Sequence, residues 1–251
     1  MVKDHPVFNE PKNKSQKIWR YLDFTKFIDL LNNNSLFFCR SDLFTDQFEG
    51  SVPKNTAVLR DFQFKEIVVN NQKSDSRYTS NYLQVQGKKD RKNIALNCWH
   101  MNDYESAAMW NLYLKSDEGI AIQSTYNKLK DCLDESEITI HLGTVNYIDY
   151  NKDTIAWNNL FIPYIHKRKS FKHEKELRAL IWSIDGVNTK SQVDFSNGGI
   201  SIPVDVNKLV EKIYVSPDSP LWYTNLVQSL TSRFGFDIEV INSKINDNPI
   251  F

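Results

Sequence analysis

Short apolar stretches that end after six or seven residues constrain the fold of this chain more than any other feature. Stretches of this length, bounded by turn residues and rich in β-branched or aromatic side chains, are typical of buried strands. Strands are therefore expected at residues 35–40 (SLFFCR), 94–100 (IALNCWH), 119–124 (GIAIQS), 144–149, 177–182 (LRALIW), 199–205, 212–217 and 236–242.

Helical spacing of apolar residues is clearest in two segments. In DFTKFIDLLNNN the apolar residues recur every three or four positions after Asp23, a plausible N-cap, and near the C-terminus Pro220 and Gly235 bracket another such pattern. Residues 154–168 are also helical in pattern, with Pro163 as a kink, and residues 71–93 indicate a polar insertion or a second helical pair. A helix is further expected after Ser106.

These strands and helices do not alternate with a regular βαβ period. The sequence therefore predicts an α+β protein with a mixed or antiparallel sheet and flanking helices. We expect a single catalytic-type domain over residues 17–251, preceded by a flexible lead-in over residues 1–16.

The charge balance excludes a global attraction to nucleic acid, because 31 Lys and Arg face 31 Asp and Glu. Three cysteines without CxxC spacing and five scattered histidines predict no metal site. The N-terminus lacks an apolar signal core, and no apolar run is long enough to cross a bilayer. A cytoplasmic protein without a membrane partner is expected.

Two stretches near the N-terminus combine charge with aromatic rings. Trp19, Arg20 and Tyr21 stand together in IWRYL, either as an aromatic staple under the first helix or as a ring-and-guanidinium surface for a phosphate. Farther on, a strand ends in Arg40 and runs into a loop with Asp46 and Glu49. Such a loop presents functional side chains, or Arg40 only pins it by an ion pair to one of the two acids.

A third group is aromatic. Trp99 and His100 end the strand expected at 94–100, and Trp110 and Tyr113 lie one helical turn apart in the helix that follows. Such a stripe is usually core, but rings near one strand end can also form a pocket wall.

The stretch KSFKHEKELRALIW carries the strongest chemical signal. On a strand, side chains two apart share a face, so Glu174, Glu176 and Arg178 are expected on one side. Two like carboxylates raise the pKa of one of them, while the arginine keeps the other ionised. A carboxylate placed in this way can stabilise an oxocarbenium-like sugar carbon. The alternative is an exposed strand start held by neighbouring basic residues.

Taken in order, these stretches resemble a bacterial family known as domain of unknown function 2971 (DUF2971), over about residues 18–182. The resemblance rests on WRYLDFTKFIDLLNNNSLFFCRSDLFTDQFEG, CWHMNDYESAAMWNLYLKSDEGIAI, VNYID and FKHEKELRALIW. Two positions depart from the family pattern: TDQFE stands where NDPFE is usual, and Leu114 follows Tyr113 where Ala is common. The order of parts also resembles ADP-ribosyltransferase-like folds, including toxins that modify DNA.

The second resemblance implies a nicotinamide-dinucleotide site, with Tyr21, Arg40 and Glu176 at the matching positions and NAD as the cofactor. It implies an enzyme that acts at an N-glycosidic bond of a nucleotide or of DNA, with anti-phage defence as its role. Arg20 and Arg40 are expected to take phosphate oxygens, and the basic stretches at 87–92 and 166–173 to track a DNA backbone. The alternatives are a DNA glycosylase, which needs base flipping, and a non-catalytic protein- or nucleic-acid-binding module.

Overall fold

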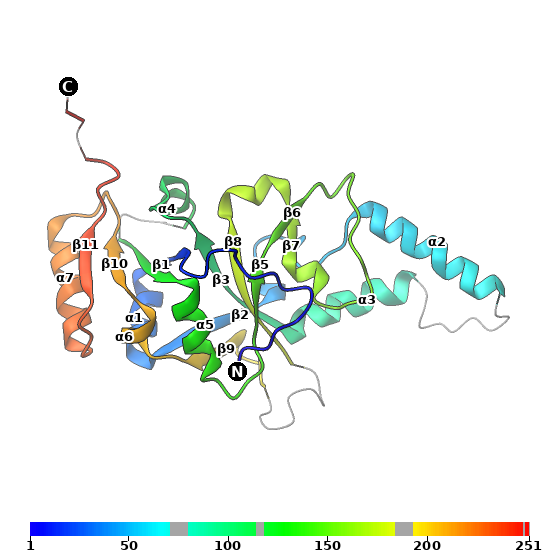
Figure 1. Cartoon of the computed structure of the whole chain (residues 1–251), viewed down its shortest axis with the longest axis horizontal. Coiled ribbons are helices and arrows are strands. Elements are labelled where there is room, and N and C mark those ends of the chain that lie inside the picture. The colour runs from blue at the N-terminus through cyan, green and yellow to red at the C-terminus, as the bar shows by residue number, and fades with distance from the viewer. Residues whose placement is uncertain (71–79, 114–117, 184–192, 248, 251) are drawn as a thin grey trace.

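A nine-stranded mixed sheet runs through the computed structural model, which describes residues 1–70, 80–113, 118–183, 193–247 and 249–250 (Figure 1). Its strands are β1 (Lys17–Asp23), β2 (Ser35–Arg40), β3 (Ile94–Met101), β4 (Gly119–Thr125), β5 (His141–Thr144), β8 (Glu176–Trp182), β9 (Gly199–Pro203), β10 (Lys212–Val215) and β11 (Glu239–Asn242). The pair β10–β11 is parallel and the other pairs are antiparallel. The predicted α+β class with a mixed sheet is confirmed.

The helices pack against this sheet or lie at its ends. They are α1 (Phe24–Asn33), α2 (Lys54–Asn70), α3 (Ser80–Asp90), α4 (Ala107–Tyr113), α5 (Tyr126–Asp134), α6 (Val206–Leu209) and α7 (Leu221–Arg233), with 3₁₀ turns η1 (Ser41–Leu43), η3 (Arg91–Asn93), η4 (Ile162–Ile165) and η5 (Lys169–Glu174). A separate parallel pair joins β6 (Asn146–Ile148) to β7 (His166–Arg168).

The sheet branches at β3. One edge of β3 pairs with β8 over seven residue positions. The other edge of β3 pairs with two strands, with β1 only at Ile18 and Trp19 and with β2 only at Cys39 and Arg40. The strands β1 and β2 therefore diverge between these short ladders and leave an opening in the sheet.

Apolar layers cover both faces of the central strands. One cluster joins Phe27, Leu31 and Trp99 to the inner faces of α5 and α7. A second cluster, on the other face, joins Leu96 and Leu180 to Tyr164 of η4 and to Phe161 just before it. Because both faces are covered, six of the seven residues of β8 are buried. This explains why LRALIW reads as an almost continuous apolar run.

The first helix begins and ends as its sequence predicts. The Asp23 carboxylate accepts a hydrogen bond from the Lys26 amide at the N-terminus, and Asn34 ends the helix in the left-handed conformation. By contrast, residues 17–23, for which the sequence predicts no strand, form the central strand β1. Residues 154–168 do not form the predicted helix, because the segment around Pro163 makes a 3₁₀ turn and then strand β7.

The N-terminal segment, assigned by its sequence to a flexible lead-in, is anchored along its first ten residues. Val2 forms a β-bridge with Ile140, the Lys3 amide donates to the Ile140 carbonyl, and Phe8 is 8% exposed. The division into a lead-in and one catalytic-type domain stays a prediction.

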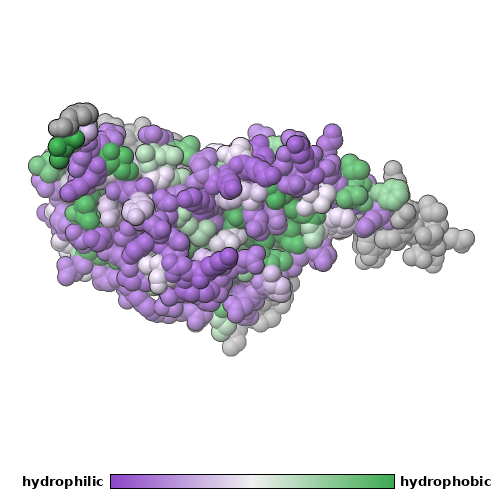
Figure 2. All heavy atoms as spheres, turned by 45° about the horizontal axis from the view of Figure 1, so that its top comes forward, coloured by the Kyte–Doolittle hydropathy of each residue, from purple (hydrophilic) through white to green (hydrophobic). Residues whose placement is uncertain are grey.

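An arm made of α2 and α3 extends away from the sheet, at the right of Figure 1. Most of the surface is polar, and hydrophobic side chains show on this arm (Figure 2). Val58, Leu59 and Phe62 of α2 are about half exposed or more. The helix α3 matches half of the predicted helical pair, while residues 71–79 lie outside the described part of the chain. Among the described residues, no helix has the length and apolarity that a membrane span requires.

The pairing of β2 with β9 predicts a strong effect at Gly199. A Cβ atom there would lie 2.0 Å from the Phe38 carbonyl oxygen, so Gly199→Ala must push the two strands apart and should lower the free energy of unfolding by about 1–3 kcal/mol. The matched control is Gly87→Ala in α3, where a Cβ meets nothing within 4 Å and alanine should add about 0.5–1 kcal/mol. Urea unfolding of both variants checks this, and equal stabilities would contradict it.

Candidate functional site

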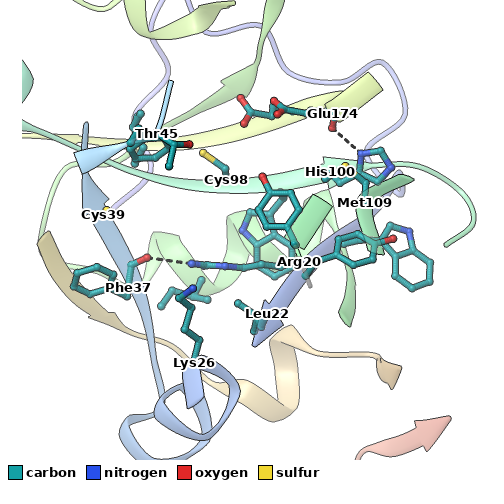
Figure 3. Close-up of a pocket in the computed structure, with 18 of the residues that line it drawn as sticks. Arg20, Leu22, Lys26, Phe37, Cys39, Thr45, Cys98, His100, Met109 and Glu174 are labelled. Carbon is teal, nitrogen blue, oxygen red and sulfur yellow. Dashed lines mark hydrogen bonds between the residues drawn. The ribbon is translucent and has the colours of Figure 1, made fainter. Parts of the chain in front are cut away.

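A cavity of about 450 Å³ occupies the opening where β1 and β2 diverge. Its walls come from β1, α1, β2 and β3, from residues 43–46 at the end of η1 and after it, from α4, and from β7, η5 and the start of β8. Figure 3 shows Glu174 at one edge of this space, Lys26 at the opposite edge and Arg20 between them. Side chains far apart in the sequence therefore share one pocket.

The opening also leaves backbone groups of β1 without a strand partner. The Asn102 amide donates to the Lys17 carbonyl, so the backbone groups of Lys17, Trp19 and Tyr21 point toward β3. The ladder with β3 stops at Trp19, opposite His100. The amide and carbonyl of Tyr21 therefore face the cavity instead of a neighbouring strand.

Beneath the cavity, Arg178 is buried between two glutamates. Its guanidinium makes paired hydrogen bonds to Glu49, with Nη1–Oε1 2.7 Å and Nη2–Oε2 2.9 Å, and a third from Nε to Glu176 Oε2 at 2.7 Å. It also donates to the Tyr164 carbonyl. Arg178 is 0% exposed, so the expected alternative of an exposed strand start held by basic residues is wrong.

Glu174 and Glu176 converge on a second buried cation, Lys167. The Lys167 ammonium bonds to Glu174 and lies 3.4 Å from Glu176 Oε1. Glu174 precedes the strand, which begins only at Glu176, and the residue between them, Lys175, is left-handed with φ 41° and ψ 53°. This turn, rather than strand alternation, brings the two carboxylates to the same side.

The two carboxylates differ in their proton affinity. Burial raises the pKa of Glu176, but Arg178 and Lys167 outweigh burial and hold it below the usual value. The pKa of Glu174 is raised by burial and then by the charge of Glu176, against the opposing effect of Lys167. The site therefore pairs a carboxylate that stays ionised with one that binds a proton more readily.

The ion cluster as a whole has an excess of negative charge. Three carboxylates (Glu49, Glu174 and Glu176) face two cations (Lys167 and Arg178). Only Glu174, Glu176 and Lys167 of these five line the cavity. The wall at this end is therefore suited to a ligand group that carries or develops positive charge.

Arg20 supplies the opposite charge in the same cavity. Its Nη2 donates to the Phe37 carbonyl at 3.3 Å, its Nη1 is buried without a hydrogen-bond partner, and no carboxylate pairs with it among the described residues. Burial lowers its pKa to about 10, so it remains charged at neutral pH. An unpaired, partly buried guanidinium is a ready site for an anionic group.

Aromatic side chains form the wall on the α4 side. Tyr21 and Tyr113 stack with ring centroids 6.4 Å apart, and Tyr113 remains 45% exposed. Trp19 also lines the cavity, although its indole is buried and donates to the Asn102 carbonyl. Tyr113 is therefore the ring most available to a ligand.

Arg168 fixes the loop on the opposite wall. Its guanidinium bonds to Asp46 Oδ1 at 2.9 Å and lies over the Phe48 ring at 4.1 Å and the Phe171 ring at 5.0 Å. The loop after η1 is thereby tied to η5, the turn that carries Glu174.

Eight of the twelve predicted site residues line this cavity: Trp19, Arg20, Tyr21, Asp46, Trp99, Tyr113, Glu174 and Glu176. The side chain of Trp99 belongs mainly to the core on the other face, where it donates to Asn97. Four residues do not line it. Glu49 and Arg178 lie beneath, and Trp110 is 2% exposed and bonded to Glu105.

Arg40 is the fourth predicted site residue that does not line the cavity. The prediction that it lies beside Tyr21 and Glu176 is wrong. It bonds to Asp42 at 2.6 Å and to the Phe195 carbonyl, outside the cavity. Neither expected ion pair forms, because Asp46 bonds to Arg168 and Glu49 to Arg178. The cavity arginine comes from β1, as Arg20.

Lys167 and His100 line the cavity although neither was predicted as a site residue. Lys167 belongs to the stretch 166–173 that was expected to track a nucleic acid, but it is 7% exposed and engaged with the two glutamates. No local sequence signal separates it from the exposed Lys169 and Lys172. His100 directly follows Trp99, and its sequence context predicts only the end of a strand. In the described part of the chain no group of three His, Cys, Asp or Glu residues could hold a metal ion.

The buried pair between Arg178 and Glu49 predicts a large effect on stability. Glu49→Gln leaves the guanidinium with one carboxylate in a site that water does not reach, and should lower the free energy of unfolding by about 3–5 kcal/mol. Glu135→Gln is the control, because Glu135 pairs with Lys208 at the surface and its loss should change stability by less than about 1 kcal/mol. Denaturant unfolding measures both, and similar values for the two variants would refute the structural role of Glu49.

The chain has limited similarity to known proteins. No family model matches the chain, so its resemblance to the family of unknown function stays a prediction, and no curated protein matches it. Among solved structures, DarT from Thermus sp. 2.9 in complex with NAD+ has a TM-score of 0.42 and 9% identity over 94% of this chain and 98% of that chain. The same protein in complex with ADP-ribosylated single-stranded DNA has a TM-score of 0.42 and 10% identity over 94% and 97% of the two chains.

Proposed function

We propose that this protein is an ADP-ribosyltransferase-like enzyme that cleaves the bond between nicotinamide and ribose in NAD+ and transfers ADP-ribose to a nucleic acid. The observation that carries the proposal is the polarity of one cavity. An ionised Glu176 and an excess of negative charge stand at one end, and the unpaired guanidinium of Arg20 stands nearby.

This polarity matches the charges of the dinucleotide. The nicotinamide ring of NAD+ is cationic, and its ribose carbon becomes more positive as the glycosidic bond breaks. The diphosphate is anionic and fits Arg20, with the exposed Lys26 also on that side of the cavity. The Tyr113 ring offers a stacking surface, and the free amide and carbonyl of Tyr21 can pair with a carboxamide.

The chemistry follows from the two carboxylates. When the bond between C1′ and the nicotinamide nitrogen breaks, its electron pair leaves with the nicotinamide, and Glu176 stabilises the oxocarbenium-like C1′. A nucleophilic oxygen or nitrogen of the acceptor then bonds to C1′ and loses a proton. Glu174 takes this proton, since its raised pKa gives it the higher proton affinity of the pair. With water as the acceptor, the same steps hydrolyse NAD+.

Support for a nucleic acid as the acceptor comes from exposed rings and lysines. Phe37 and Tyr113 line the cavity and are each between about one third and one half exposed, and bases stack on such rings. Lys169 and Lys172 of η5 and Lys88, Lys89 and Lys92 of the other basic stretch are exposed and can contact phosphates. For the biological role we propose anti-phage defence in the cytoplasm, which rests on the family resemblance.

The decisive experiment incubates the protein with NAD+, alone and with single- or double-stranded DNA, and follows the products by mass spectrometry. Release of nicotinamide together with a DNA adduct of ADP-ribose is the expected result. A free base released from DNA without NAD+ would instead favour a glycosylase. Binding of DNA without any product would favour a non-catalytic module.

Glu176→Gln should lower the rate of nicotinamide release by roughly 10²–10³-fold, because the amide cannot stabilise the positive sugar carbon. This variant also leaves Arg178 with one carboxylate and should lose stability as Glu49→Gln does, but Arg178 keeps Glu49 and Lys167 keeps Glu174, so rates are compared under conditions in which the variant is folded. Circular dichroism checks the fold, and Glu135→Gln serves as the activity control. Full activity in Glu176→Gln would exclude this assignment.

The raised pKa of Glu174 predicts an acid limb in the pH profile of the transfer rate. Its raised pKa means that it becomes protonated as the pH falls through a value above that of an ordinary glutamate, and a protonated Glu174 cannot accept the proton of the acceptor. The transfer rate should therefore fall on this limb, while Glu176 stays ionised. In Glu174→Gln the transfer rate should be low and the limb absent. An unchanged limb in that variant would assign it to another group.

A further inference from the structure

His100 carries an imidazole whose tautomer is fixed by the backbone. Its Nδ1 lies 2.6 Å from the carbonyl oxygen of Glu174 (Figure 3). A carbonyl oxygen only accepts hydrogen bonds, so Nδ1 carries the proton and donates it. The remaining nitrogen, Nε2, then has a free lone pair in the neutral ring.

The surroundings keep the ring neutral and the lone pair unused. Burial lowers the pKa of His100, and the charges of Lys175 and His173 act in the same direction, against the hydrogen bond to Glu174. The residue is 3% exposed, and Nε2 has no hydrogen-bond partner in the structure. The ring nevertheless belongs to the wall of the cavity. A buried acceptor at a cavity wall favours a ligand that brings a donor.

The register of the sheet places this acceptor beside the reacting end of the site. His100 on β3 is directly opposite Glu176 on β8, so their side chains are cross-strand neighbours on the same face. A ligand group at His100 is therefore next to the group at Glu176. If Glu176 faces C1′ of the nicotinamide ribose, the adjacent donors are the hydroxyls of that ribose.

We propose that His100 Nε2 accepts a hydrogen bond from a hydroxyl of the nicotinamide ribose and so selects a ribose over a deoxyribose in the cavity. This inference rests on the proposed function. The alternative is a purely structural His100, whose only task is the Nδ1 bond that ties β3 to the end of η5.

Two variants separate the nitrogens of the ring. Asparagine in His100→Asn places its amide donor near the Nδ1 position and has nothing at Nε2, so the bond to Glu174 can persist. Glutamine in His100→Gln reaches the Nε2 position with an amide that can accept, and loses the Nδ1 donor. We expect His100→Asn to weaken NAD+ binding roughly three- to tenfold with little loss of stability. His100→Gln should keep more of the affinity and lose stability.

The ligand is varied in parallel, using NAD+ and analogues that lack the 2′- or 3′-hydroxyl of the nicotinamide ribose. Titration calorimetry should show that the wild-type protein binds one deoxy analogue more weakly and that His100→Asn no longer distinguishes that analogue from NAD+. The imidazole ¹⁵N resonances provide a readout without turnover: Nε2 should be unprotonated in the free protein and should shift when NAD+ binds.

The outcomes distinguish the two proposals. If the wild-type protein does not bind NAD+, the proposed function fails and this inference falls with it. If NAD+ binds but His100→Asn retains full affinity and full discrimination between the analogues, only the role of His100 is overturned. A protonated Nε2 in the free protein would also overturn it.

Discussion

The buried guanidinium of Arg178 is the interaction on which the architecture of the site depends. It joins three segments, because it bonds to Glu49 in the loop after η1, to Glu176 at the start of its own strand and to the Tyr164 carbonyl in η4. An arginine that is fully buried requires partners for its charge and its donors. Arg178 therefore fixes the position of Glu176 at the cavity wall and, together with Lys167, holds its carboxylate ionised.

The branching of the sheet supplies the space in which this carboxylate can act. If β1 and β2 continued to pair along β3, the ladder would close and Arg20 would lie between packed strands. Because the ladders are short, Arg20, the backbone of Tyr21 and the side chain of His100 all reach the same opening. The cluster below and the opening above thus make a cavity with separate negative and positive regions, as the proposed dinucleotide requires.

Sequence periodicity succeeded where one residue and its near neighbours decide the structure. Asp23 caps α1, LRALIW is a buried strand, and Glu176 contacts Arg178 two positions later. Predictions from the sequence failed where a residue's contacts are with distant parts of the chain. The order of parts pointed to Arg40 as the cavity arginine, yet Arg40 is held by Asp42 next to it, and Arg20 takes the place. Residues 154–168 read as a helix, but Pro163 and the pairing of β7 with β6 impose another course.

The sequence by itself determined the α+β class, the pair of glutamates and the arginine that follows them, because these depend on side-chain period and local charge. Only the tertiary structure decided that Lys167 is buried between the glutamates instead of exposed to a phosphate backbone, that Glu49 lies beneath the cavity, and that His100 presents a free nitrogen to it. Burial and long-range pairing set the charge and the hydrogen bonds of each of these groups, and neither leaves a trace in a short stretch of sequence.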